Sequence, residues 1–395
     1  MRNVGTVTRG IRTPIIKAND DLAKIVVDSL LEAKKNDNFE FRDRDIVAVT
    51  EAVVAIAENN YATVDAIAED IKNKFPKGEI GLLNPILSRN RFSILLKAIA
   101  RGTKHITIQL SFPSDEVGNG ILDEDKLDAN GIDLSSIISE KEYAEKFGDF
   151  VHPFTGINMV DFYRDLIEKE NCKVDFVFSN NPKTILEYSK DVLVANIHTR
   201  AKTKKLLKAS GGNIILGLDD ILTTSVNGSG YNSKYGLLGS NKATEEKVKL
   251  FPEHGDALVE KIQKELATKT GKHIEVMIYG DGGFKDPVGK IWELADPVVS
   301  PAYTRGLEGT PNELKLKYLS DNQFKELKGD ELKQAIIDEI KKKPENLKGS
   351  MQTQGTTPRR LTDLIGSLCD LTSGSGDKGT PVVFIQGYFD NLASE

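Results

Sequence analysis

The stretch that decides the fold runs from Asp175 to Leu218 and reads DFVFSNNPKTILEYSKDVLVANIHTRAKTKKLLKASGGNIILGL. Its segments DFVFSN, VLVANI and NIILGL are short and rich in apolar residues, as buried strands are. Between them lie PKTILEYSKD and TRAKTKKLLKAS, which we interpret as helices. Strands separated by helices of this length pair in parallel through right-handed crossovers. The stretch therefore predicts a βαβαβ unit that could form its own subdomain.

The same alternation of helical and strand patterns continues over the rest of the chain. Helices are predicted at Asp20–Lys35, Val64–Phe75, Gly255–Thr268, Glu326–Lys348 and Leu361–Leu371. Strands are predicted at His105–Leu110, Ile274–Tyr279 and Val382–Gln386. Asp45–Ala57, DIVAVTEAVVAIA, predicts a buried strand that runs into a turn or a second strand. The expected fold class is α/β with mixed sheets.

The composition excludes several classes of protein. The 395 residues include 53 Lys and Arg against 59 Asp and Glu, a net charge of −6, so binding to nucleic acid through charge alone is not expected. No apolar run is long enough for a transmembrane helix, and the first ten residues lack the core of a signal peptide. Two cysteines and five scattered histidines form neither a disulfide framework nor a zinc pattern. We expect a soluble, cytoplasmic protein.

The first candidate site is SFPSDEVGNG, Ser111 to Gly120, which follows a predicted strand directly. It places Asp115, Glu116 and Asn119 in a turn. Loops at strand ends carry many functional groups, and carboxylate oxygens suit magnesium or manganese. The alternative is a turn of Asp, Gly and Asn that only reverses the chain.

The second candidate site is VMIYGDGGFKDP, Val276 to Pro287. Asp281 follows a strongly apolar strand, two glycines come next, and Asp286 lies five residues further on. An aspartate at a strand end is a common metal ligand in α/β enzymes, and glycines let a phosphate approach the backbone. The alternative is an Asp-Gly hairpin turn.

The third candidate site is LTSGSGDKGTPVVFIQG, Leu371 to Gly387. Consecutive amides and Lys378 could bind phosphate groups. The order of residues is not that of a Walker loop, and the loop leads from a helix to a strand. The alternative is a flexible connection.

Three weaker features stay open. GSGYNSKYGLLGSN, Gly228 to Asn241, is either an ordered substrate loop or a surface excursion. Gly306–Tyr318 could contribute Glu308 or Glu313, or could simply start a helix at its Thr-Pro pair. Arg359 and Arg360 stand at the start of a predicted helix and could bind a phosphate or a carboxylate, or form a plain salt bridge.

In order along the chain, these segments resemble the coenzyme F-420 (deazaflavin) gamma-glutamyl ligases, most closely a long bacterial branch of that family. Matching segments are GIRTPIIKANDDLA (Gly10–Ala23), DIVAVTEAVVAIAE (Asp45–Glu58), SDEVGN, VMIYGDGG and CDLTSGSGDKGTPVVFIQG. The resemblance implies that Asp115 or Glu116, together with Asp281, binds a divalent metal. It implies nucleotide contacts from Arg12, Thr13, Pro14, Ile15, Glu51, Asn119, Ser373, Gly374, Ser375, Gly376, Asp377, Lys378, Gly379 and Thr380.

The chain departs from the family pattern at three places. Asp115 is one residue too far from Asn119, whereas Glu116 has the family spacing. Ile56 stands where the family commonly has lysine. Gly282 stands where the family usually has a side-chain oxygen after the metal-binding aspartate.

The resemblance implies an amide-forming ligase. The terminal phosphate of GTP (or ATP) would pass to an acceptor carboxylate with the help of Mg²⁺ or Mn²⁺, and glutamate or a similar amine would attack the acyl phosphate. Asp115, Asp281 and Lys378 would act at the reacting groups. A homodimer is also implied. The open alternatives are a non-catalytic nucleotide-binding or regulatory homologue, a folate-type glutamate ligase, and an enzyme whose inserted unit does the work.

The resemblance also divides the chain into domains. Residues 1–120 and 236–395 would form a discontinuous ligase-like core. Residues 121–235, with the βαβαβ unit, would be an inserted α/β subdomain.

Overall fold

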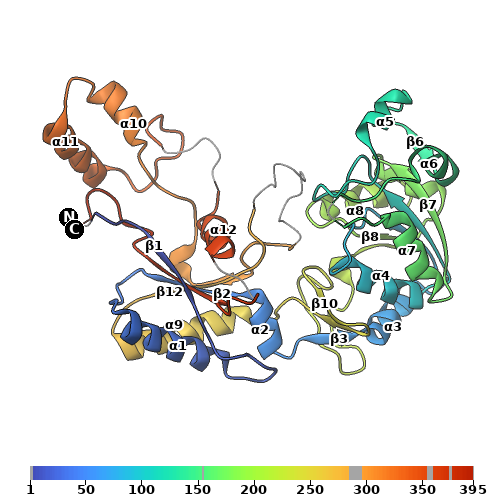
Figure 1. Ribbon diagram of the computed structural model, residues 1–395, viewed down its shortest axis with the longest axis horizontal. Coiled ribbons are helices and arrows are strands. Elements are labelled where there is room, and N and C mark those ends of the chain that lie inside the picture. The colour runs from blue at the N-terminus through green and yellow to red at the C-terminus, as the bar shows by residue number, and fades with distance from the viewer. Residues whose placement is uncertain (1–2, 154, 284–295, 354–358, 373–375, 395) are drawn as a thin grey trace.

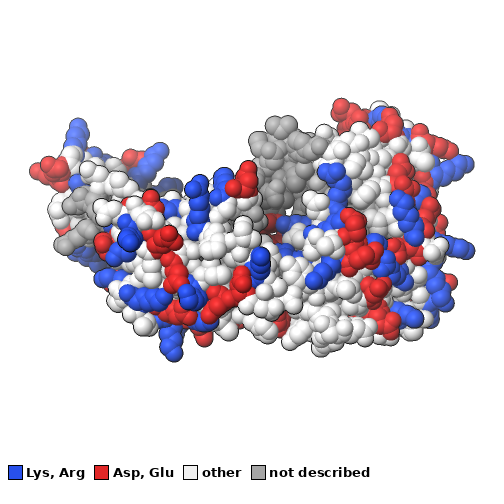
Figure 2. Space-filling view, turned by 60° about the horizontal axis from the view of Figure 1, so that its bottom comes forward, with Lys and Arg blue, Asp and Glu red and all other residues white. Residues whose placement is uncertain are grey.

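The computed structural model describes residues 3–153, 155–283, 296–353, 359–372 and 376–394. The described chain forms two lobes that lie side by side (Figure 1). We call residues 61–251 the inserted lobe and the remainder the core lobe. On the face shown in Figure 2, acidic and basic side chains are interspersed over both lobes, without a large field of one sign.

The core lobe is built on a five-stranded sheet. Its order is β1 (Val7–Ile11), β14 (Val382–Gln386), β2 (Ile46–Thr50), β12 (Glu275–Tyr279) and β13 (Ala302–Tyr303). Strands β2 and β12 are parallel, and β14 is antiparallel to both β1 and β2. The carboxyl ends of β1, β2 and β12 and the start of β14 therefore meet at one edge.

Apolar residues cover both faces of this sheet, because each face is packed by helices. Val47 and Val49 of β2 belong to the apolar cluster shared with α1 (Leu22–Asp37) and α9 (Gly255–Thr270). Ile46 and Ala48 belong to the cluster on the other face, which includes Ile365 of α12 (Leu361–Thr372). The helices start where local signals favour it: Asp21 caps α1 by accepting a hydrogen bond from the backbone N of Lys24.

The inserted lobe contains a six-stranded sheet. Its order is β6 (Ile137–Ser139), β7 (Lys173–Ser179), β5 (His105–Leu110), β4 (Glu79–Leu83), β8 (Val192–Val194) and β9 (Ile215–Gly217). All neighbours are parallel except β6. A three-stranded sheet completes the lobe, with the order β10 (Asn241–Thr244), β11 (Lys247–Lys249) and β3 (Tyr61–Thr63).

Helices surround the six-stranded sheet. They are α3 (Val64–Lys74), α4 (Phe92–Arg101), α5 (Glu124–Ala129), α6 (Glu140–Phe147), α7 (Met159–Glu168), the 3₁₀ segment η1 (Pro182–Glu187), α8 (Arg200–Ala209) and the 3₁₀ segment η2 (Leu218–Asp220). Most of them share one large apolar core with the sheet, while η1 and α8 pack in a second, smaller cluster with Leu83, Val192 and Ile215.

A small helical region extends from the core lobe at the upper left of Figure 1. It follows the 3₁₀ turn η3 (Arg305–Leu307) and consists of α10 (Leu316–Tyr318), the π-helical η4 (Leu319–Gln323) and α11 (Gly329–Lys342). Its own core is formed by Leu314, Leu319, Ile336, Ile340 and Leu347.

The α/β fold class is confirmed, and two local predictions need correction. Asp45–Ala57 is a strand followed by helix α2 (Glu51–Ala57), because the apolar run from residue 51 packs at helical spacing rather than as a second strand. In the βαβαβ stretch the three strands are present, but the first predicted helix is the shorter 3₁₀ segment η1.

The six-stranded sheet also crosses the domain boundary expected at residue 120. Strands β4 and β5 precede that residue, yet they lie between β7 and β8. The expected insertion therefore shares its sheet with residues 79–110. Within the described residues, no helix is long and apolar enough to span a membrane.

Candidate active site

Four of the sequence segments singled out above meet at one edge of the five-stranded sheet. Arg12 follows β1, Glu51 follows β2, and Asp281 follows β12 by two residues. The backbone N of Thr13 donates to the carbonyl O of Gly379 at 3.3 Å, which joins the first segment to the C-terminal loop. The convergence follows from the strand directions, because parallel strands end on the same side and antiparallel β14 begins there.

A cavity of about 650 Å³ lies beside β1 at this edge. Arg12, Lys378 and Thr380, all predicted nucleotide contacts, line it. Glu32, Asn36 and Asp37 of α1 line it as well. The cavity thus combines two cations with carboxylate and amide groups, a set that can bind phosphates at one part and hydroxyl or amino groups at another.

Several of the other predicted nucleotide contacts lie exposed near this edge. Pro14 and Ile15 are exposed, and 85% of the Ile15 surface is open to solvent. Gly376, Asp377 and Gly379 lie on the exposed approach to β14. Ser373, Gly374 and Ser375 lie outside the described residues, as does Asp286.

An ion-pair cluster lies where β12 ends. The Arg91 guanidinium donates through Nη2 to Asp281 and through Nη1 to Asp296 Oδ1, the latter at 2.7 Å. Asp296 Oδ2 also accepts the backbone N–H of Asp281 at 2.9 Å. Burial by itself would lower the pKa of the Arg91 guanidinium, but the two carboxylates outweigh this effect, so the pKa is raised.

A second ion pair lies next to this cluster. Lys249 Nζ is 3.1 Å from both carboxylate oxygens of Glu51, and both residues are buried. Burial raises the pKa of Glu51 from 4.5 to about 7, with Lys249 opposing the rise. Asp296 adds to the rise through its negative charge, so this pair and the Arg91 cluster are electrostatically linked.

Helix α12 closes the cluster from the other side and explains Gly282. Asp370 Oδ2 accepts the backbone N–H of Gly282 at 3.2 Å, and Ser367 Oγ accepts that of Gly283 at 3.1 Å. A Cβ at Gly282 would lie 2.8 Å from Ser367 Cα, closer than packed atoms allow. Helix packing therefore requires glycine here. The other departure, Ile56, packs against the core of α1 and α9.

The first candidate segment lies on the other sheet, at the carboxyl end of β5. The Asp115 carboxylate accepts hydrogen bonds from the backbone N of Leu87 at 2.8 Å, of Val117 at 3.0 Å and of Asn119 at 2.8 Å. Asn119 Nδ2 adds a fourth at 2.8 Å. Loss of hydration raises the pKa of Asp115, and these hydrogen bonds oppose the rise. In this structure the carboxylate organises its own loop.

Glu116, like Asp115, uses its carboxylate to bind backbone amides. Its oxygens accept the backbone N–H groups of Ile197, His198 and Thr199 at 2.6, 3.1 and 2.9 Å, directly before α8. Within the described residues, no three His, Cys, Asp or Glu side chains come together as metal ligands. The metal roles implied for Asp115 and Glu116 stay predictions.

Sequence reasoning missed Arg91, Asp296 and Lys249. Arg91 and Asp296 are 205 residues apart, and neither lies in a recognisable pattern, so only the pairing of the lobes reveals them. The glycine-rich loop Gly228–Asn241 pointed to this region only in part. The backbone N of Lys242, the residue after the loop, donates to the carbonyl O of Asn90, next to Arg91, at 2.8 Å.

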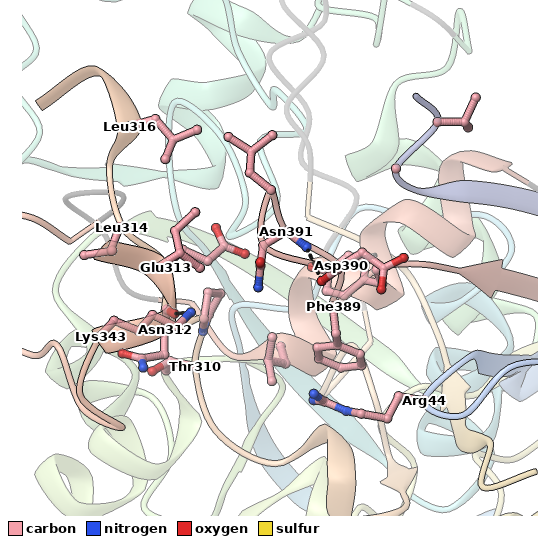
Figure 3. A pocket seen from close by; sticks show the side chains of 18 of the residues that line it. Arg44, Thr310, Asn312, Glu313, Leu314, Leu316, Lys343, Phe389, Asp390 and Asn391 are labelled. Carbon is pink, nitrogen blue, oxygen red and sulfur yellow. Dashed lines mark hydrogen bonds between the residues drawn. The ribbon is translucent and has the colours of Figure 1, made fainter. Parts of the chain in front are cut away.

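Three weaker candidates are not brought to this edge by any described element. Arg359 and Arg360 are exposed before α12. Glu313 lines a larger cavity, of about 780 Å³, at the opposite edge of the sheet (Figure 3). There the Arg44 guanidinium stacks 4.0 Å from the centre of the Phe389 ring. Apart from Glu313, that cavity is lined by none of the residues proposed for the site.

Comparison with known proteins identifies the family of the chain. The family described as F420-0:Gamma-glutamyl ligase matches residues 10–387, which include all four segments that meet at the edge and the inserted lobe. No curated protein matches the chain. Because the match covers nearly the whole sequence, the chain belongs to the F420-0:gamma-glutamyl ligase family.

Proposed function

We propose that the protein is a nucleotide- and divalent-metal-dependent ligase that joins a substrate carboxylate to glutamate or a similar amine. Family membership supports a glutamate ligase. The observation that carries the finer proposal is the meeting of Arg12, Glu51, Asp281 and the loop before β14 at one sheet edge. Ligands of α/β proteins bind outside the carboxyl ends of strands.

The nucleotide is proposed to occupy the cavity beside β1. Arg12 and Lys378 supply positive charge for its phosphates, and Thr380 supplies a hydroxyl. GTP is the nucleotide implied by the resemblance, with ATP as the alternative. This placement brings the terminal phosphate toward Glu51 and Asp281, which end the next strands along the edge.

The metal is proposed to bind at Asp281. Carboxylate oxygens are the preferred ligands of Mg²⁺ and Mn²⁺, and the hydrogen-bonded neighbour Asp296 supplies a second carboxylate. Asp281 and Asp296 bring two carboxylates to the single guanidinium of Arg91, while Glu51 is paired with Lys249, so this end of β12 favours an added cation. A bound metal would neutralise charge on the transferring phosphate.

The proposed reaction has two steps. An oxygen of the acceptor carboxylate attacks the γ-phosphorus and the nucleoside diphosphate leaves. The amine nitrogen of glutamate then attacks the acyl carbon, loses a proton and releases phosphate. The chain's part is to hold the two substrates in line and to exclude water, because phosphoryl transfer needs little covalent help from a protein. A homodimer remains implied by resemblance.

Replacing Asp281 by Asn tests this proposal. The variant keeps the size of the side chain but loses the charge, so we expect turnover to fall by orders of magnitude with the fold intact. Amide product is measured by mass spectrometry with GTP or ATP and Mn²⁺ or Mg²⁺. The control is Asp133→Asn in the inserted lobe, where an exposed carboxylate bonds only to its own loop. Unchanged turnover in Asp281→Asn would contradict the assignment.

Nucleotide binding is tested separately by thermal shift with GTP, ATP and GDP, each with and without metal. A ligand at about 100 times its dissociation constant stabilises the native state by about 2.7 kcal/mol. A metal-dependent shift that is lost in Asp281→Asn supports the site. The engagement of Asp281 by Arg91 also fits a homologue that binds nucleotide without catalysis. A shift without any product would favour that alternative.

A further inference from the structure

The guanidinium at the end of β12 belongs to the inserted lobe, while the two carboxylates that it binds belong to the core lobe. Arg91 comes from the loop between β4 and α4. Its side chain is 22% exposed, that of Asp281 24% and that of Asp296 only 2%. Removing this cation would take a charged hydrogen-bond partner from each of two neighbouring carboxylates that are largely shielded from water, which is costly.

The loop that carries Arg91 is held by hydrogen bonds that are buried or part-buried. The hydroxyl of Tyr163 donates to the carbonyl O of Ile86 at 2.6 Å and accepts the backbone N–H of Ser88 at 3.0 Å. Ser88 Oγ accepts the backbone N–H of Arg91 at 3.1 Å. The Asp115 carboxylate holds the same loop at Leu87. Because these hydrogen bonds fix the loop, they also position the guanidinium against the core lobe. Such fixed positioning is typical of a functional cation.

We propose that Arg91 is an internal counter-cation that competes with the divalent metal for Asp281 and Asp296. The inference rests on the metal-dependent ligase proposed above. The lone pairs that a metal would need are the ones that the guanidinium uses, and two cations packed on the same carboxylates repel each other. Arg91 thus keeps the two aspartates neutralised before the metal binds.

This competition links the two lobes. Because Arg91 is in the inserted lobe, metal binding at Asp281 breaks an ion pair between the lobes. The released guanidinium remains at the site and can bind an anionic group of a substrate. Through Arg91 the inserted lobe takes part in the site itself.

The test is a direct measurement of Mn²⁺ affinity by electron paramagnetic resonance, without nucleotide, on the whole chain. In Arg91→Gln the competitor is gone, so we expect Mn²⁺ to bind roughly tenfold more tightly than to the parent protein, in the usual range of coupling between two binding events. The control Arg89→Gln loses the same charge from an exposed side chain in the same loop, and we expect its affinity to match the parent protein.

Equal or weaker Mn²⁺ binding in Arg91→Gln would overturn the inference, and so would the same gain in Arg89→Gln. Because Arg91→Gln could fold poorly, Arg91→Lys provides a second measurement. Lysine keeps the charge but loses the two-pronged contact, so its affinity should fall between the other two. These affinities do not depend on amide formation. If the protein makes no amide product but shows this order of Mn²⁺ affinities, the proposed ligase activity is contradicted and the proposed competition between Arg91 and the metal is still supported.

Discussion

The buried side chain of Glu51 is expected to make the stability of the folded protein depend on pH. Burial beside β2 raises its pKa to about 7, against an ordinary 4.5, so the folded protein holds a proton that the unfolded chain releases. Stability is therefore expected to decrease as pH rises from about 5 to about 8. The contribution of this one group cannot exceed about 1.4 kcal/mol per pH unit.

This prediction is checked by urea unfolding across that pH range. Glu51→Gln cannot ionise, so its free energy of unfolding should depend less steeply on pH, whatever its absolute stability after Lys249 loses its partner. His152, whose pKa is lowered by burial, contributes in the opposite direction in both proteins and cancels in the comparison. Equal slopes in the two proteins would show that Glu51 titrates normally.

Among the loops, the segment after β5 shows that a pattern suited to metal binding can serve structure. Asp115 accepts four hydrogen bonds and joins its own loop to the loop that carries Arg91. Asp115→Ala is expected to lower the free energy of unfolding by about 3 kcal/mol, because several part-buried donors lose their partner at about 1 kcal/mol or more each. Urea unfolding measures this loss.

The matched control is Asp133→Ala. Asp133 also closes a turn with its carboxylate, by accepting from the backbone N and the hydroxyl of Ser135, but it is exposed. Its loss should cost about 1 kcal/mol or less, because water replaces the carboxylate. In Asp115→Ala, the amide of Leu87 should also exchange its hydrogen faster. An Asp115 variant as stable as the control would show that the carboxylate does not support these loops.

At the scale of the whole molecule, the chain enters and leaves the inserted lobe at adjacent points. The backbone N of Leu250 donates to the carbonyl O of Asn60 at 2.9 Å, and Asn60 Nδ2 donates to Phe251 O at 2.8 Å. These contacts favour residues 61–251 as one unit, while the resemblance predicts an insertion at 121–235. The two divisions predict different outcomes when the chain is shortened.

Deleting residues 121–235 removes β6 to β9 and leaves β4 and β5 with unpaired edges and exposed apolar faces, so we expect aggregation. Replacing 61–251 by a short Gly-Ser linker removes the whole lobe and should leave a soluble, folded core lobe. Size-exclusion chromatography and circular dichroism distinguish the two. A monomeric, folded protein lacking only 121–235 would show that β4 and β5 do not need the strands beside them.

The sequence by itself determined the α/β class and central elements such as β2, β5, β12, β14, α1 and α9, because apolar periodicity follows from which face of each element is buried. It did not predict β1, β4 or the helices α4 to α7. It also placed Asp281 at a strand end and Lys378 in the loop before a strand, where α/β proteins bind ligands, whereas Arg12 and Glu51 were implied by resemblance alone. Only the tertiary structure decided the rest. Sheet order brought β4 and β5 between β7 and β8, and lobe packing brought Arg91 onto Asp281, 190 residues away. Such contacts depend on how whole elements pack, and no local pattern of residues records that packing.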